Sequence, residues 1–184
     1  NLFTLGEWYN QHKENVVLGV TLGTGMGFGI VINGQLYTGG NGNALEYGHS
    51  PFSWGVCEKN VCIGFIRNRA KDLYGKEISP VLIEDYCRSG DDKAKKIYDE
   101  FGNNLGIVLS HVINMFDPNV VSIGGGLSNA FDCFKDSMFL ALKTHSPSFS
   151  LHDISILESK FKKTSTMIGA SLMVRNADQS KNGL

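Results

Sequence analysis

Short runs of β-branched and apolar residues alternate with longer amphipathic stretches, which predicts a fold that mixes strands and helices. The apolar runs predict strands at residues 16–22, 28–32, 35–38, 120–123 and 154–157. Helical spacing of apolar positions predicts helices at residues 1–10, 65–74, 80–89, 91–116, 129–143 and 165–176. Three strands followed by alternating helices and strands indicate an α/β fold, with a mixed sheet and flanking helices.

Turn-forming residues separate the first three strands, which are predicted to form an antiparallel meander. Asn33-Gly34 lies between the second and third strands, and this pair favours a type I′ turn because both central positions need positive φ. The polar residues 10–15 are expected to form a loop. Residues 39–64 are rich in glycine and lack a regular period, and the polar tail from Ala177 is expected to be frayed.

Length and composition indicate one domain in a reducing compartment. The 184 residues can bury a sizeable core, and the formal net charge of −1 gives no support to a nucleic-acid partner. No apolar run reaches the ~18 residues that would span a membrane. The four cysteines lack the dense spacing of a secreted disulfide framework, which favours the cytoplasm. The chain starts with Asn1 in an apparent helix, so we expect a fragment of a longer protein.

Two glycine clusters follow predicted buried strands and are candidates for binding phosphate. Glycine lets the backbone turn sharply and approach a ligand, so that its N–H groups can point at phosphate oxygens. Each cluster alone is typical of an ordinary turn, but together they predict a nucleotide held from two sides. The candidate residues are Gly23, Thr24 and Gly25 in the first cluster and Gly124, Gly125 and Gly126 in the second.

The two clusters differ from the common nucleotide fingerprints. The first lies between antiparallel strands, and Phe28 stands where a dinucleotide-binding loop would have its third glycine. The chain also has no Gly-x-x-x-x-Gly-Lys-Ser/Thr motif, which excludes a P-loop. We expect the Thr24 hydroxyl to help hold a terminal phosphate. The second cluster precedes a predicted helix, whose free N–H groups would attract an anion.

Glu46 and His49 are candidates for binding a sugar. Their spacing places both on one side of a single helical turn, where a carboxylate and an imidazole suit neighbouring hydroxyls. A surface glutamate with a structural histidine is the plainer interpretation. His49, Cys57 and Cys62 are also zinc-type ligands at loop spacing, although no cysteines form a Cys-x-x-Cys pair.

The order of these motifs resembles the ROK family, which contains sugar kinases, sugar-responsive repressors and uncharacterised members. The resemblance covers nearly the whole chain and implies the actin/hexokinase-like (ribonuclease H-like) fold. The motifs that carry it are Leu22-Gly23-Thr24-Gly25-Met26-Gly27, Ile32-Asn33-Gly34, Glu46-Tyr47-Gly48-His49, Phe116-Asp117-Pro118-Asn119, Ile123-Gly124-Gly125-Gly126-Leu127-Ser128 and Gly169-Ala170.

The resemblance implies a role for each motif. Residues 23–25 would hold the ATP phosphates, and residues 124–126 would line the other side of the nucleotide. Glu46 and His49 match the Glu-x-Gly-His motif that binds sugar hydroxyls in the family. The same histidine ligates zinc there, together with three cysteines.

This sequence departs from the zinc motif of the family. Cys57 and Cys62 match two of the cysteines, but Gly55 stands where the first would be. Glu58 and Val61 replace two glycines of the motif, and Gly64 replaces a glutamate that binds sugar in the family. These departures count against zinc and remove one charge-assisted contact to the sugar, worth ~1.5–3 kcal/mol.

The resemblance also implies that residues 1–184 are the C-terminal, nucleotide-binding domain of a sugar kinase. Asn1 matches the second asparagine of an Asn-Asp-Ala-Asn segment, so the catalytic aspartate and the N-terminal domain would precede this chain. No catalytic residue is therefore assigned here. The expected reaction is ATP- and magnesium-dependent phosphorylation of a hexose at its 6-hydroxyl, by a cytoplasmic homodimer.

Several alternatives remain open from the sequence. The opening Asn1-Leu2 and the run from Gly23 to Phe28 look most like D-allose kinases, with N-acetylglucosamine kinases and glucokinases as near neighbours. A sugar-sensing domain of a ROK-type repressor is the second hypothesis. A degenerate homologue with a structural role is the third.

Overall fold

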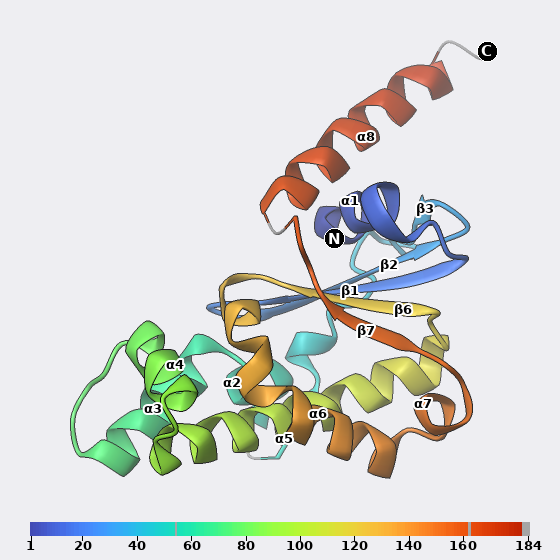
Figure 1. The fold of residues 1–184 in the computed structure, drawn as a ribbon. Helices are drawn as coiled ribbons and strands as arrows, with labels where there is room; N and C mark the ends of the chain where they lie inside the picture. The colour runs from blue at the N-terminus through green and yellow to red at the C-terminus, as the bar shows by residue number, and fades with distance from the viewer. Residues whose placement is uncertain (54, 162, 182–184) are drawn as a thin grey trace.

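A computed structural model describes residues 1–53, 55–161 and 163–181, with only the backbone of residue 163 and residues 175–181. Its main feature is a five-stranded sheet with the strand order β3-β2-β1-β6-β7 (Figure 1). The strands of this sheet are β1 (Val16–Leu22), β2 (Met26–Ile32), β3 (Gln35–Leu36), β6 (Val120–Gly124) and β7 (Ser155–Glu158). A separate two-stranded hairpin consists of β4 (Pro51–Phe52) and β5 (Gly55–Val56).

The sheet is mixed, as the sequence predicts. β1, β2 and β3 pair antiparallel, and Asn33 and Gly34 have φ of 50° and 81° in the turn between the last two. β1 pairs parallel with β6, and β6 pairs parallel with β7. The register of β1 and β6 aligns Thr21 with Gly124, so both strands end at the same edge of the sheet.

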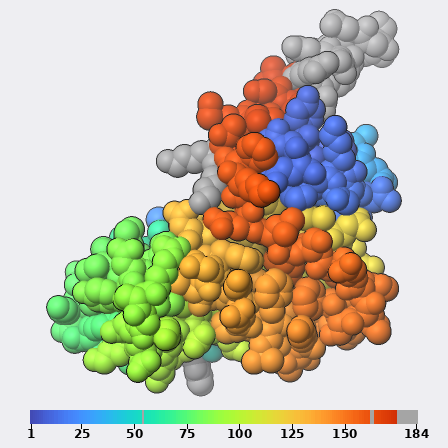
Figure 2. Space-filling view, in the orientation of Figure 1, coloured from blue at the N-terminus to red at the C-terminus, as the bar shows by residue number. Residues whose placement is uncertain are grey.

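Helices cover both faces of the sheet, so that the fold has three layers with the sheet in the middle (Figure 1). One face carries α1 (Leu2–Glu7), which continues as a π-helix over Trp8–His12, together with α8 (Lys163–Lys181). The other face carries α2 (Cys57–Asn60), α3 (Ile63–Tyr74), α4 (Pro80–Arg88), α5 (Asp92–Phe116), α6 (Phe131–His145) and α7 (Pro147–Leu151). Figure 2 shows this second layer as a broad body, and α1 with α8 as a narrower part beside it.

The hydrophobic core lies between the sheet and α5. Leu18 and Val20 on β1 and Ile123 on β6 are fully buried, as are Leu105 and Leu109 on α5. The buried strand residues belong to the predicted apolar runs, and the buried α5 residues recur with the helical period. The α/β prediction is therefore confirmed. No helix among the described residues has an apolar stretch that could cross a membrane.

Three local predictions need correction. Residues 10–15 are not wholly a loop, because the helix runs to His12 and ends where Lys13 adopts a left-handed conformation. The polar side chains there reflect exposure to solvent and do not break the helix. α7 was not predicted, although Ser146 caps it by accepting from the Phe149 N–H, and Pro147 occupies its first turn. The tail from Ala177 is helical as far as Lys181, and residues 182–184 lie outside the described part.

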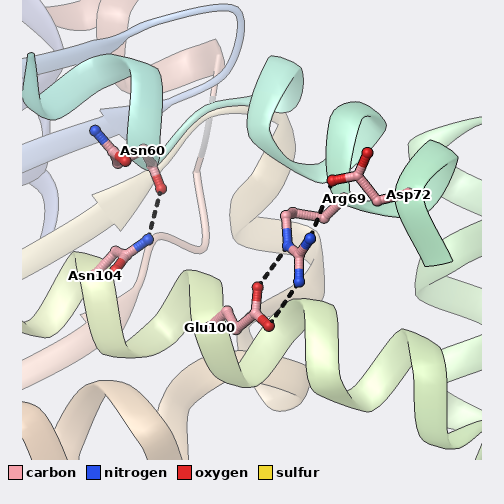
Figure 3. A network of polar contacts seen from close by, with 5 residues as sticks. All are labelled: Asn60, Arg69, Asp72, Glu100 and Asn104. Carbon is pink, nitrogen blue, oxygen red and sulfur yellow. Dashed lines mark hydrogen bonds and ion pairs between the residues drawn. The ribbon is translucent and has the colours of Figure 1, made fainter. Parts of the chain in front are cut away.

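The segment at residues 39–64 contains short regular elements that polar contacts hold on α5 (Figure 3). The Asn60 side chain donates to the Val56 carbonyl (3.0 Å), and the Asn104 amide on α5 donates to the Asn60 carbonyl (3.4 Å). Further along, Arg69 on α3 forms a bidentate pair with Glu100 on α5, at 2.6 and 2.9 Å. α2 and α3 are therefore fixed relative to α5.

Candidate functional site

The two glycine clusters meet in one cleft of about 360 Å³ at the edge of the sheet where β1 and β6 end. Ligands of open α/β sheets commonly bind beyond the carboxyl ends of strands, and this cleft lies at such a place. The residues that line the cleft are Thr21, Leu22, Gly23, Thr24, Gly25, Met26, Gly27, Glu58, Gly125 and Gly126. The structure thus brings together five of the six predicted nucleotide-binding residues.

Gly124 is the sixth, and it does not line the cleft. It ends β6 and is buried, and a Cβ on it would lie 2.6 Å from the ring of Phe3. Its lack of a side chain is therefore explained by packing against α1, which the sequence could not reveal.

The first cluster forms a tight turn whose backbone is anchored to α3. The Gly23 N–H donates to the Gly25 carbonyl (3.0 Å), and the Ile63 N–H at the start of α3 donates to the Gly23 carbonyl (2.8 Å). Thr24 is exposed at the tip of the turn. A small, fixed turn with an exposed hydroxyl can accommodate an anion close to its backbone.

The second cluster packs directly on the end of β1. Gly125 has φ of 90°, and a Cβ on it would lie 2.2 Å from the Leu22 carbonyl oxygen. Only glycine is compatible with this position. The predicted helix start is shifted, because a 3₁₀ turn over Gly126–Ala130 precedes α6, which begins at Phe131. The cluster therefore lets a ligand come close to its backbone, but it does not supply the N-terminus of an α-helix.

A second pocket of about 430 Å³ adjoins the cleft and shares Thr21, Gly125 and Gly126 with it. Phe3 on α1 and Phe161 after β7 supply aromatic surface, and threonine and asparagine side chains supply polar groups. The remaining lining residues are Asn129, Thr164 and Thr166. An apolar pocket with a few polar groups suits a planar, hydrogen-bonding ligand. Sequence reasoning missed these residues because they carry no motif and lie far apart in the chain.

Glu46 directly precedes a 3₁₀ turn, Tyr47–His49, that ends at His49, so the two residues lie together as the spacing predicts. His49 Nδ1 is 3.6 Å from Glu46 Oε2, and both side chains are 69% exposed and so open to a ligand. A Cβ on Gly48 would lie 2.6 Å from the Met26 carbonyl, so this turn packs beside the first glycine cluster. The candidate sugar-binding pair and the candidate phosphate-binding turn are therefore neighbours.

Tyr47 fixes the turn that carries this pair. Its hydroxyl is 2.8 Å from His111 Nδ1 on α5, and its ring packs edge-on against Phe28 on β2. His111 lies on the exposed side of α5 and contacts the turn through this hydrogen bond. Spacing alone could not have paired two residues so far apart in the sequence.

The three candidate zinc ligands do not converge. Cys57 and Cys62 are buried in the hydrophobic core, whereas His49 faces solvent. Burial raises the pKa of the Cys57 thiol, which disfavours the thiolate that zinc requires. Within the described ranges, no group of three His, Cys, Asp or Glu side chains is placed to hold a metal ion. These residues do not fit zinc.

Comparison with known proteins gives one consistent picture. The profile of the ROK family matches residues 1–177. The N-acetyl-D-glucosamine kinase of Pectobacterium carotovorum subsp. carotovorum (strain PC1) is 34% identical, over 80% of this chain and 54% of its own. The chain thus spans about half the length of the curated relatives that it matches.

Solved structures agree with the fold. A protein from Cytophaga hutchinsonii ATCC 33406 superposes with a TM-score of 0.86 at 28% identity, over 95% of this chain and 63% of its own. A ROK family glucokinase from Streptomyces griseus, in complex with glucose and AMPPNP, gives 0.81 at 23% identity, over 96% and 66%. A ROK family transcriptional regulator, a homologue of the E. coli MLC protein, gives 0.83 at 25% identity, over 93% and 49%.

Proposed function

The chain belongs to the ROK family, and from this premise we propose that it is the C-terminal, nucleotide-binding domain of an ATP-dependent sugar kinase. The observation that carries the proposal is the single cleft lined by both glycine clusters, beside the turn that holds Glu46 and His49. Related proteins named N-acetyl-D-glucosamine kinase, and a glucokinase crystallised with glucose and AMPPNP, support the same assignment.

Each part of the site has a role in this proposal. The backbone N–H groups of residues 23–25 and the Thr24 hydroxyl bind the terminal phosphates of ATP. Gly125 and Gly126 allow close approach from the other side, and the adjoining pocket takes the nucleoside between Phe3 and Phe161. Magnesium, when bound to the phosphates, neutralises their charge.

Sugar binding is assigned to Glu46 and His49, which accept from and donate to neighbouring hydroxyls. Asn1 lies close to Gly29 on β2, since a Cβ on Gly29 would lie 2.5 Å from the Asn1 Cβ. The family resemblance suggests that the catalytic aspartate of the proposed kinase precedes Asn1 in the full-length protein. It would take the proton of the 6-hydroxyl as that oxygen attacks the terminal phosphate.

The substrate is proposed as a hexose or N-acetylhexosamine. The relatives named above favour N-acetylglucosamine or glucose, whereas the residues at the start of the chain and in the first turn favour D-allose. Gly64 leaves the sugar one carboxylate fewer than in the family, so selectivity rests more heavily on Glu46 and His49. Homodimerisation and a cytoplasmic location are part of the proposal and follow from the family.

A sugar-sensing repressor is the second candidate, favoured by the likeness to a transcriptional regulator at 25% identity. In that case Glu46 and His49 bind the sugar, and a DNA-binding segment is attached elsewhere in the full-length protein. A helix-turn-helix upstream of the sugar domain in the complete reading frame would favour this candidate over the kinase.

The proposal is tested by sugar-dependent ADP release from Mg·ATP with the full-length protein. The sugars are allose, glucose, fructose, N-acetylglucosamine and N-acetylmannosamine. Turnover with one sugar far above the others supports the kinase and identifies its substrate. Binding of a sugar, seen as a raised melting temperature without any turnover, would support the repressor instead.

Replacing Tyr47 by Phe should weaken sugar binding about three- to tenfold, because the turn loses a hydrogen bond worth ~0.5–1.5 kcal/mol to α5. The KM for the sugar rises while the KM for ATP stays the same. His111→Ala should give a similar loss, and the double variant no further loss. Additive effects of the two substitutions would show that this hydrogen bond does not position the sugar-binding turn.

A further inference from the structure

Glu58 places a carboxylate inside the proposed phosphate cleft. It is the one acidic residue among those that line the cleft in the described part of the chain. A Cβ on Gly25 would come within 2.7 Å of Glu58 Oε2, so the carboxylate lies directly over the phosphate-binding turn. Within the described residues, no hydrogen bond or ion pair engages this half-buried side chain.

The backbone that carries Glu58 cannot easily move away from the cleft. Cys57, the preceding residue, is fully buried, and Asn60 is tied to Val56 and, through its carbonyl, to Asn104 on α5 (Figure 3). The carboxylate can rotate about its own side-chain bonds, but α2 holds the Glu58 backbone at the rim of the cleft. A bound nucleotide must therefore be compatible with a negative charge at this place.

The Glu58 carboxylate and the phosphates of a bound nucleotide both carry negative charge. Terminal phosphates bound at residues 23–25 would lie within a few ångströms of the Glu58 carboxylate, and like charges at such distances repel strongly in a partly buried site. A divalent cation between the two anions converts the repulsion into attraction. Mg²⁺ in particular is usually held by one or two protein carboxylates together with substrate phosphates and water, and seldom by a complete set of protein ligands.

We propose that Glu58 is a protein ligand of the divalent cation that accompanies the nucleotide phosphates. This inference rests on the proposed function, because it needs phosphates in the cleft. It agrees with the donor chemistry of the cleft, where a carboxylate oxygen lies at the phosphate turn. Glu58 thereby makes nucleotide binding depend on the metal.

The test is calorimetric titration of AMPPNP into the full-length protein, once with excess Mg²⁺ and once with EDTA. The quantity compared is the ratio of the two dissociation constants, EDTA over Mg²⁺. We expect this ratio to fall at least tenfold in Glu58→Gln, because the variant loses affinity with the metal and gains it without the metal. Glu58→Asp, which keeps the charge, should retain most of the ratio.

Glu77→Gln is the matched control, since Glu77 is exposed and lies outside the cleft. Mn²⁺ electron paramagnetic resonance gives a second readout, in which Glu58→Gln should weaken the nucleotide-dependent capture of the ion. An unchanged ratio in Glu58→Gln overturns the inference and leaves the proposed function intact. Tighter binding in both conditions also overturns it, because Glu58 would then only obstruct the cleft. If the unaltered full-length protein binds no AMPPNP in either condition, the proposed function itself fails.

Discussion

Replacing Gly25 by Val should reduce nucleotide affinity at least about 100-fold while the chain stays folded. The added methyl groups would occupy the cleft over residues 23–25, where the phosphates have to approach the backbone N–H groups. Losing two hydrogen bonds to charged phosphate oxygens, at ~1.5–3 kcal/mol each, corresponds to about 100-fold or more.

The fold tolerates this substitution because little protein surrounds the position. A Cβ on Gly25 meets only the far end of the Glu58 side chain, which can rotate away, and Gly25 does not have a positive φ. The measurement is titration calorimetry with AMPPNP, accompanied by a thermal melt. Because the obstruction is steric, the loss should appear both with Mg²⁺ and with EDTA, unlike the effect of Glu58→Gln.

Gly40→Val provides the control for this experiment. Gly40 is exposed, has no atom within 4 Å of an added Cβ, and lies outside the cleft. This variant should bind nucleotide like the unaltered chain. Equal affinity of Gly25→Val and Gly40→Val would remove the first glycine cluster from the nucleotide site.

Replacing Glu7 by Leu should cost about 3–5 kcal/mol of unfolding free energy, because several buried donors lose their acceptor at ~1–3 kcal/mol each. Glu7 on α1 is fully buried, yet its carboxylate accepts from several groups. The donors are Ser122 Oγ (2.5 Å), Ser159 Oγ (2.8 Å), Ser165 Oγ and Gln11 Nε2 (3.2 Å). Leucine removes their shared acceptor at the point where α1, β6 and α8 meet.

Denaturant titration tests this prediction, since the midpoint should fall without a change in the slope. Glu7→Gln is the matched control because it keeps the shape and one carbonyl oxygen, and we expect it to lose only about 1–2 kcal/mol. A Glu7→Leu variant as stable as the unaltered chain would show that the serine hydroxyls find other acceptors and that the buried carboxylate is dispensable.

Much of the fold could be predicted because its signals are local. The apolar run at Val16–Leu22 forms β1, and Asn33-Gly34 makes the hairpin turn that its backbone preferences favour. α5 extends from the Asp91 cap to the residue before Asp117, where the left-handed conformation ends the helix. The missed α7 had a local signal too, in the pair Ser146-Pro147. The error at residues 10–12 arose because polar residues indicate that a segment is exposed to solvent, and an exposed segment can still be helical.

The candidate site could be predicted only in part. The two glycine clusters and the Glu46–His49 turn have sequence patterns, and the structure places them side by side. The three candidate zinc ligands do not converge, because the burial of Cys57 in the core depends on how α2 packs. Glu58 and Phe161 line the cleft and the adjoining pocket through packing alone and have no pattern of their own.

The sequence by itself therefore determined the strands, most helices, the tight turns and the family, because backbone preference and burial period depend on neighbouring residues. Only the tertiary structure decided which side chains converge. The parallel pairing of β1 with β6 brings Gly25 and Gly125 into one cleft, and the packing of α1 buries Glu7 among serines from three distant segments. Such contacts depend on how whole layers pack against one another, which no local run of residues encodes.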